Sequence, residues 1–332
     1  MKFNIIYFAV FVFQVLECSI AAPTLDNQTV NELTVVCNDN SLLTEIKKIF
    51  DKVTPGIKHL GDIPAYAATS CQQIATLRPD SKSGYYWIQE PTRPAHVYCQ
   101  LNDAPFGEEG VWMKIADVNM TKTSSKCPSG LEKVTSPKSL CRKRVDRGCS
   151  SAVFSTHNVP YKRVCGKVIG YQYYSTDGFH PYYSAQSRTI DELYVEGVSI
   201  THSHNPRHHI WTLAAGLEED PRADHSVYRC PCSTELANVP FTGLIPDFIG
   251  DDYYCDTGSR TAYQNRYYLD DPLWDGQGCG RFSTCCEGNK KPWFCKELPE
   301  PVDSDIEVRL CCDESRSSDE DVLLEAIELY VQ

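Results

Sequence analysis

The sequence predicts a β-rich (α+β) extracellular domain that is braced by disulfide bonds and carries long loops. From Ala65 onward the chain is rich in Tyr, Thr and Val, contains frequent Gly and Pro, and lacks long stretches of helical periodicity. Cysteine is unusually frequent, with 17 in 332 residues. Turn signals such as Asp177-Gly178 and Asp275-Gly276 divide the region into short segments.

Three segments have the apolar alternation of half-buried strands. Asp305–Cys311 alternates throughout, with its apolar residues at the even-numbered positions. Glu192–Thr201 alternates and then shifts register at Gly197, which predicts a β-bulge there. The last segment places every second residue from Ile327 to Val331 on one apolar face.

Residues 1–21 are expected to form a signal peptide. Lys2 precedes an almost unbroken apolar run, and small residues lead to a cleavage position near Ala21. No later stretch approaches the roughly 18 consecutive apolar residues of a membrane helix, so we expect a secreted, extracellular protein without a membrane anchor. Residues 22–64 form an N-terminal segment. Helical spacing from Ser41 predicts one short amphipathic helix there, with a stop at Pro55-Gly56.

Removal of the signal peptide would take Cys18 with it and leave an even number of cysteines in an oxidising compartment, where full pairing is expected. Sequons at Asn27 and Asn119 predict two glycosylation sites. The formal net charge of -12 argues against a nucleic-acid partner and favours association with cations. The basic stretch from Lys133 to Arg147 could meet an anionic glycan, but we favour a solvated loop.

A calcium site is the first candidate for a metal centre, because flexible loops with many carboxylates suit this ion. The spacing of these carboxylates does not match an EF-hand, and capping or turn roles are the alternative. The candidate ligands are Asp251, Asp252, Asp256, Asp270, Asp271 and Asp275.

A second candidate metal site consists of four closely spaced histidines that could converge on zinc or copper: His202, His204, His208 and His209. Strand alternation would make His202 and His204 lean to one side while His208 and His209 point oppositely. The alternative makes His209 a hydrogen-bonded core residue beside Trp211 and leaves the other three solvated.

Sequence motifs of catalysis are missing from the chain. It contains no Gly-x-Ser-x-Gly elbow, no His-Glu-x-x-His motif and no phosphate-binding loop. The Cys230-Pro231-Cys232 motif lacks the spacing of redox exchangers, and the adjacent pairs Cys285-Cys286 and Cys311-Cys312 most simply bond to separate partners. We therefore expect no enzymatic activity.

Residues 65–115 contain a pattern of four segments: Ser70-Cys71, Ser83–Ile88, Val97-Tyr98-Cys99 and Gly110-Val111-Trp112. This pattern resembles the opening of a fibrinogen-like domain. The resemblance implies a Cys71–Cys99 disulfide across two strands, with Tyr85, Trp87 and Trp112 in the core. It ends at Ile115, so the calcium loop and ligand pocket of that family are not carried over.

Residues 116–332 are expected to form a Cys-rich, β-rich domain that is continuous with this opening. The chain from about Cys71 to the carboxyl end also resembles a group of secreted invertebrate (cnidarian) proteins, the skeletal organic matrix proteins of stony corals. The resemblance rests on segments such as Cys230-Pro231-Cys232, Cys255–Gly258 and Pro292–Cys295. It implies a location and a material role, and it supplies no catalytic residues.

The leading functional hypothesis is a secreted, non-enzymatic component of an extracellular or skeletal matrix, associated with calcium or mineral. Its partners would be matrix macromolecules, a mineral surface or glycans. The alternative is a lectin-like protein that stacks sugars on exposed aromatic rings. The candidate rings are those of Tyr171, Tyr173, Tyr174, Tyr182 and Tyr183. These tyrosines could equally be core and strand residues.

Overall fold

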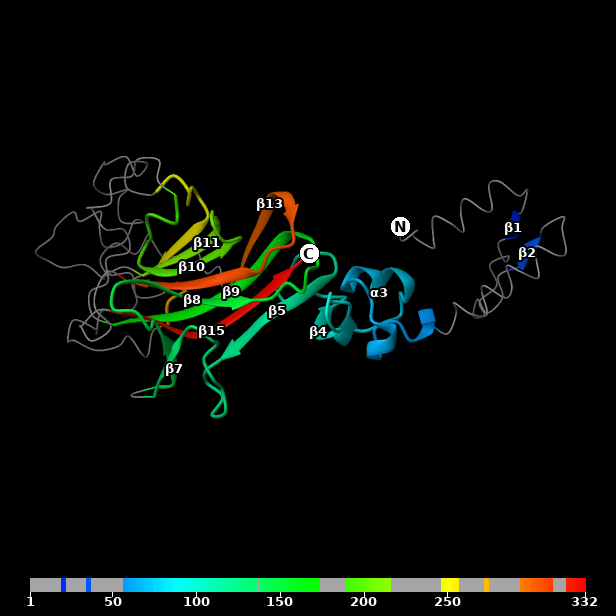
Figure 1. The fold of residues 1–332 in the computed structure, drawn as a ribbon, viewed down its shortest axis with the longest axis horizontal. Helices are drawn as coiled ribbons and strands as arrows, with labels where there is room; N and C mark the ends of the chain where they lie inside the picture. Colours follow the sequence, from blue (N-terminus) through cyan, green and yellow to red (C-terminus); the bar gives the residue numbers. More distant parts are fainter. Residues whose placement is uncertain are drawn as a thin grey trace, which may run out of the picture.

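The computed structural model describes residues 19–21, 34–36, 56–135, 138–173, 189–215, 246–256, 272–274, 293–312 and 321–332. Strands dominate this part of the chain, which confirms the predicted β-rich fold class. The short strands β1 (Ser19–Ala21) and β2 (Thr34–Val36) pair with each other. The other strands form two larger sheets (Figure 1).

The larger sheet has eight strands in the order β13-β9-β15-β5-β4-β3, with β7 paired to β15 and β6 paired to β7. All of its pairings are antiparallel. Its strands are β3 (Gly84–Ile88), β4 (Ala95–Gln100), β5 (Trp112–Asn119), β6 (Glu132–Val134), β7 (Leu140–Arg142), β9 (Tyr161–Tyr173), β13 (Phe294–Val302) and β15 (Asp321–Val331).

The smaller sheet has five strands in the order β12-β11-β10-β14-β8. Only its β11–β12 pairing is parallel among the described strands. Its strands are β8 (Gly148–Phe154), β10 (Gly197–His202), β11 (His208–Ala215), β12 (Tyr253–Asp256) and β14 (Ile306–Cys312).

The two sheets pack on each other through their apolar faces, with β10, β11 and β14 beside β9 and β15 (Figure 1). Ile200, Leu213 and Val308 from the smaller sheet and Ile327 and Leu329 from the larger one are fully buried in a single core. This core confirms the predicted apolar face of the last strand. Strands from residues 65–115 and from residues 116–332 share the larger sheet, so these two segments build one structure.

Strand β14 confirms the predicted strand but contradicts its predicted half-burial. Every residue from Ile306 to Cys312 is buried. The even-numbered residues face the core, whereas the opposite face carries Glu307 and Arg309, which are only 7% and 8% exposed. The polar half of the alternation therefore marks a second buried layer instead of a solvent face.

The prediction for Glu192–Thr201 is wrong in its first half. Residues 192–196 form turns and irregular backbone, and β10 starts only at Gly197. The register shift in the pairing with β11 falls between Ile200 and Thr201, not at Gly197. Gly197 serves another purpose, because its φ of 140° and its approach to Leu213 leave no room for a side chain.

Four disulfides lie in the described part of the chain. Cys149–Cys311 joins directly opposed residues of β8 and β14, and Cys165–Cys295 does the same for β9 and β13. Cys127–Cys141 holds the segment beside β7. Cys149 and Cys311 are 162 residues apart. By lowering the entropy of the unfolded chain, a bond across such a loop raises the free energy of unfolding by about 3 to 5 kcal/mol.

The Cys71–Cys99 disulfide is the one implied by the fibrinogen-like resemblance, but it does not cross two strands. Cys71 begins helix α3 (Cys71–Leu77), and only Cys99 lies in a strand. The Ser70 hydroxyl caps this helix by accepting a hydrogen bond from the Gln73 backbone N–H at 3.1 Å. A single-turn 3₁₀-helix, η1 (Pro64–Tyr66), precedes it.

The core positions implied by the same resemblance are correct only for Trp112, which is fully buried. In β3, Tyr86 and Ile88 face the core, so Tyr85 is 63% exposed and Trp87 is only partly buried. The strand is therefore present with the opposite side facing inward.

The helix predicted from Ser41 lies largely outside the described residues. Residues 56–58 are described and are helical, so helical backbone is present at the predicted stop Pro55-Gly56 and directly after it. Among the described residues, no helix is long and apolar enough to cross a bilayer.

Replacement of Gly197 by Ala tests the close packing at the start of β10. The new Cβ would stand 1.9 Å from the Leu213 carbonyl oxygen. We expect Gly197→Ala to lower the free energy of unfolding by more than about 3 kcal/mol in urea denaturation. Gly107→Ala is the control: Gly107 also has positive φ but no atom within 4 Å, so a loss of about 1 kcal/mol is expected. Equal losses would contradict the close packing.

Candidate functional site

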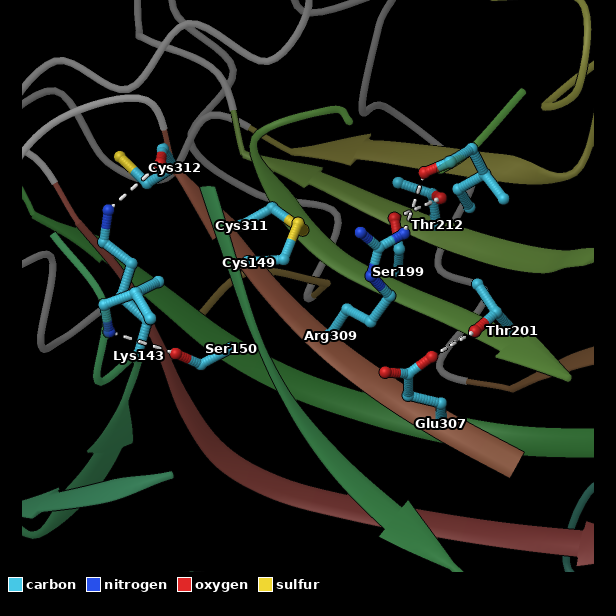
Figure 2. The surroundings of a disulfide bond; sticks show 12 residues. Lys143, Cys149, Ser150, Ser199, Thr201, Thr212, Glu307, Arg309, Cys311 and Cys312 are labelled. Atoms are coloured by element: carbon cyan, nitrogen blue, oxygen red, sulfur yellow. Dashed lines mark hydrogen bonds between the residues drawn. A yellow bond between two sulfur atoms is a disulfide. The ribbon is translucent and has the colours of Figure 1, made fainter. Parts of the chain in front are cut away.

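The outer face of the smaller sheet is polar and buried, which makes it the foremost place to look for chemistry. The strand registers place Arg309 opposite Ser199, and Ser199 opposite Thr212. Glu307 lies opposite Thr201 in the same way. Figure 2 shows these side chains together on one face of β10, β11 and β14. All five are less than a tenth exposed, so each polar group requires an internal partner.

Arg207, in the connection between β10 and β11, binds two carboxylates at once. Its Nε donates to Glu307 Oε2 at 2.6 Å, and its Nη2 donates to Glu307 Oε1 at 3.3 Å. Its Nη1 donates to Asp191 Oδ1 at 2.6 Å, and its backbone N–H donates to the other oxygen of that carboxylate. Arg207 therefore ties the segment around Asp191 to the sheet.

The protonation of these acids follows from that geometry. Burial alone would raise the pKa of Glu307, but hydrogen bonds from Arg207 and Ser151 outweigh it and lower the pKa. The pKa of Asp191 is lowered for the same reason, because the Arg207 contacts exceed the effect of burial. Both acids are therefore ionised at neutral pH and are poor proton donors.

Arg309 is the most enclosed cation of this layer. Its Nη1 donates to the Ile190 carbonyl at 3.2 Å, and its buried Nε has no hydrogen-bond partner among the described residues. Burial and the nearby charge of Arg207 lower its pKa, while Glu307 and Asp191 oppose that change. Two arginines and two carboxylates thus balance each other's charge.

A chain of hydroxyl groups continues the layer toward β11. The Ser199 and Thr212 hydroxyls lie 3.1 Å apart, and His209 Nε2 lies 2.8 Å from the Thr212 hydroxyl. The expectation that His209 is hydrogen-bonded is confirmed. Burial, with a smaller effect of the Lys296 charge, lowers the pKa of His209 to about 3, so its imidazole is neutral at physiological pH.

The structure does not gather the four predicted histidines into a metal site. His202 and His208 face each other across β10 and β11 with stacked rings 5.2 Å apart, instead of pointing oppositely. His202 is buried rather than solvated, and burial followed by the His208 charge lowers its pKa to about 4. His204 is exposed in the connecting turn. His209 follows His208 directly in β11, so strand alternation puts it on the opposite face, where it is paired with Thr201.

The predicted calcium ligands are only partly described. The Asp252 carboxylate is bonded to the Lys296 ammonium, and Asp251 is exposed on the preceding turn. Asp256 ends strand β12, and its side chain is outside the description. Asp270, Asp271 and Asp275 lie outside the described residues. Within the described ranges, no three His, Cys, Asp or Glu side chains are grouped as metal ligands.

The basic stretch from Lys133 to Arg147 is not a solvated cationic loop throughout. Lys143 is fully buried, and its ammonium donates to the backbone carbonyl of Cys312 at 3.0 Å (Figure 2). The same ammonium donates to the backbone carbonyl of Asp146 at 3.1 Å. Lys138 is paired with Glu325. These contacts engage Lys138 and Lys143 inside the fold, whereas Lys133, Arg144 and Arg147 are exposed as the solvated-loop interpretation expects.

Two other sets of predicted surface residues have different outcomes. Asn119 ends β5, and its side-chain oxygen accepts hydrogen bonds from the Thr121 N–H at 3.0 Å and the Thr121 hydroxyl at 2.6 Å. Asn27 lies outside the described residues. Tyr171 is only 3% exposed, so its ring cannot stack on a sugar. The Tyr173 side chain and the other three candidate tyrosines lie outside the description.

Arg207, Asp191 and Arg309 were missed by sequence reasoning. The signal available was the presence of Glu307 and Arg309 within an otherwise apolar strand, since such charges are rarely buried unless paired. Arg207 follows the cis peptide bond Asn205-Pro206 in an ordinary-looking polar turn, which carries no such signal.

Comparisons with known proteins do not assign a family. No family model matches the chain, and no curated protein matches it. The polar layer must therefore be interpreted from its own geometry. The acids of this layer are ionised and paired, and its imidazole is neutral. We therefore interpret the layer as a set of contacts that stabilises the smaller sheet.

Loss of the Arg207 cation tests the stabilising role of this layer. In Arg207→Gln the Glu307 carboxylate would remain buried without its cation, so we expect a loss of about 3 kcal/mol in the free energy of unfolding by urea. Lys162→Gln, which breaks the exposed Lys162–Glu297 pair, is the control and should leave the urea midpoint nearly unchanged. Similar small losses in both variants would show that the layer is solvated.

The lowered pKa values of His202 and His209 predict a loss of stability in mild acid. Histidines in the unfolded chain take up protons near pH 6.5, whereas His202 and His209 stay neutral in the fold down to about pH 4 and about pH 3. Stability should therefore fall as the pH drops below about 6.5, with about 2 kcal/mol lost by pH 5 from His202 alone. The urea midpoints of wild type and H202Q/H209Q at pH 7 and pH 5 provide the test.

The double variant should lose less stability than wild type between these two pH values. His59→Gln, at an exposed histidine, is the control and should behave as wild type. An unchanged drop in H202Q/H209Q would contradict the neutral state of the two rings.

Proposed function

We propose that this protein is a secreted, non-enzymatic structural component of an extracellular matrix. The supporting observation is that both sheets are crosslinked by disulfides. Each sheet has a disulfide between opposed residues of neighbouring strands, Cys149–Cys311 in one and Cys165–Cys295 in the other. Such bonds persist in oxidising compartments, which supports export from the cell.

The state of the polar groups also favours a structural role. Groups that would serve acid–base catalysis have pKa values near neutrality. Here the pKa values of Glu307 and Asp191 are lowered by Arg207, and the pKa of His209 is about 3. The charged layer therefore contributes to durability, as a matrix component requires.

Association with calcium or mineral follows from charge in this proposal. The net charge of -12 favours accumulation of cations at the surface without a dedicated pocket. Glycosylation at Asn27 and Asn119 belongs to the same secreted state. The resemblance to skeletal organic matrix proteins points in the same direction.

A glycan-binding, lectin-like function is the second candidate. The observation that favours it is a row of aromatic rings on β3 and β4 that point away from the core, of which Tyr85 is the most exposed. These rings are not the tyrosines that the sequence indicated, so the alternative now depends on a different surface.

Sequential extraction of the source tissue tests the matrix role. An antibody against the chain should find it in the insoluble residue after a salt wash, with release by a calcium chelator, because attachment would run through cations and matrix contacts. Recovery of most of the protein in the first salt extract, or turnover of a substrate by the purified protein, would contradict the proposal.

A further inference from the structure

An aromatic row covers the outer face of the hairpin formed by β3 and β4. The register pairs Tyr85 with Tyr98 and Trp87 with His96, and all four side chains point away from the core. Tyr85 is 63% exposed, the most exposed large apolar side chain in the described residues. We refer to these four residues as the aromatic row.

The rings of the aromatic row touch in sequence along the hairpin. Trp87 and His96 are stacked with centroids 4.7 Å apart, and Tyr85 lies 5.3 Å from both His96 and Tyr98. Cross-strand contacts of this kind stabilise a hairpin by at most about 1 kcal/mol each. Hairpin stability alone would be served by covering the rings, yet Tyr85 remains open to solvent.

Lys114 of β5 flanks one end of the aromatic row, because it is paired with Tyr98 across the two strands. The Lys114 ammonium lies 5.4 Å from the Tyr98 ring centroid and 5.2 Å from that of buried Tyr330. The same ammonium bonds to Asp117 and Glu328 at 3.3 Å. Tyr98 therefore contacts a cation whose charge is compensated by two carboxylates, and this contact adds to those that Tyr98 makes within the row.

The charge of this face selects the class of ligand. The outward residues of β3 and β4 are the aromatic row and Gln100, none of which is acidic, whereas the whole chain carries a charge of -12. A polyanionic glycan would be repelled by the chain as a whole. A neutral sugar ring instead offers C–H groups to an aromatic face and hydroxyls to its polar rim.

We propose that the aromatic row of β3 and β4 is a binding site for a neutral polysaccharide, whose sugar rings stack on Tyr85 and its neighbours. This inference rests on the glycan-binding function proposed above and not on the matrix role. It names the site and the ligand class that this function would use.

Titration calorimetry of the full chain with cellohexaose and chitohexaose provides the test. Tyr85→Ala should weaken binding about fivefold, because one stacking contact contributes about 1 kcal/mol. Tyr85→Phe keeps the ring and should bind as wild type. Val153→Ala removes a similarly exposed apolar side chain, 62% exposed, from the smaller sheet and should have no effect. Urea midpoints of all variants establish that they are folded.

The outcomes separate this site from the proposed functions. If wild type binds a neutral hexasaccharide and Tyr85→Ala binds equally well, glycan binding stands and the aromatic row is overturned as its site. Lack of binding to both hexasaccharides overturns the site together with the glycan-binding function, but not the matrix role. Preferred binding of a heparin hexasaccharide or a proline-rich peptide overturns the assignment to a neutral polysaccharide.

Discussion

Strand β14 is the element on which the rest of the smaller sheet depends, because it is buried on both faces. Its core face packs against β15 of the larger sheet in the shared apolar core. Its opposite face buries Glu307 and Arg309, and burying charges is costly unless they are paired. The pairing to Arg207, the contact with the Ile190 backbone and the crosslink through Cys311 all follow from this placement. The smaller sheet is therefore stabilised by salt bridges and a disulfide bond as well as by apolar contacts.

Sequence patterns predict which segments become strands better than which side of a strand is covered. The alternation in 305–311 and 327–331 correctly predicts β14 and the end of β15. It cannot indicate that a polar face is buried, because that depends on a partner such as Arg207, distant in sequence. In β3 both Tyr85 and Tyr86 are plausible core residues, and only the pairing with β4 decides between them. Likewise, Gly197 suggests an irregularity, but its conformation serves a close approach to Leu213.

The candidate sites were harder to predict because they depend on contacts between distant segments. His202 and His208 lie close in sequence, but their stacking follows from the β10–β11 register. His209, the next residue of β11, lies on the other face. Lys143 belongs to a basic stretch in the sequence and is nevertheless buried against the Cys312 carbonyl. The exposed aromatic row arises because the hairpin buries Tyr86 and Ile88 instead of Tyr85 and Trp87. The exchange of the two faces of β3 relative to the prediction thus creates the surface that we propose for glycans.

Disulfides crosslink opposed strands in both sheets, and the proposed export of the protein from the cell depends on them. Mass-spectrometric mapping of disulfides in the native protein, digested without reduction, tests this claim most directly. We expect the digest to contain peptides that join Cys149 to Cys311 and Cys165 to Cys295. Recovery of these cysteines as free thiols, or bonded to other partners, would contradict both the registers of the sheets and the proposed compartment.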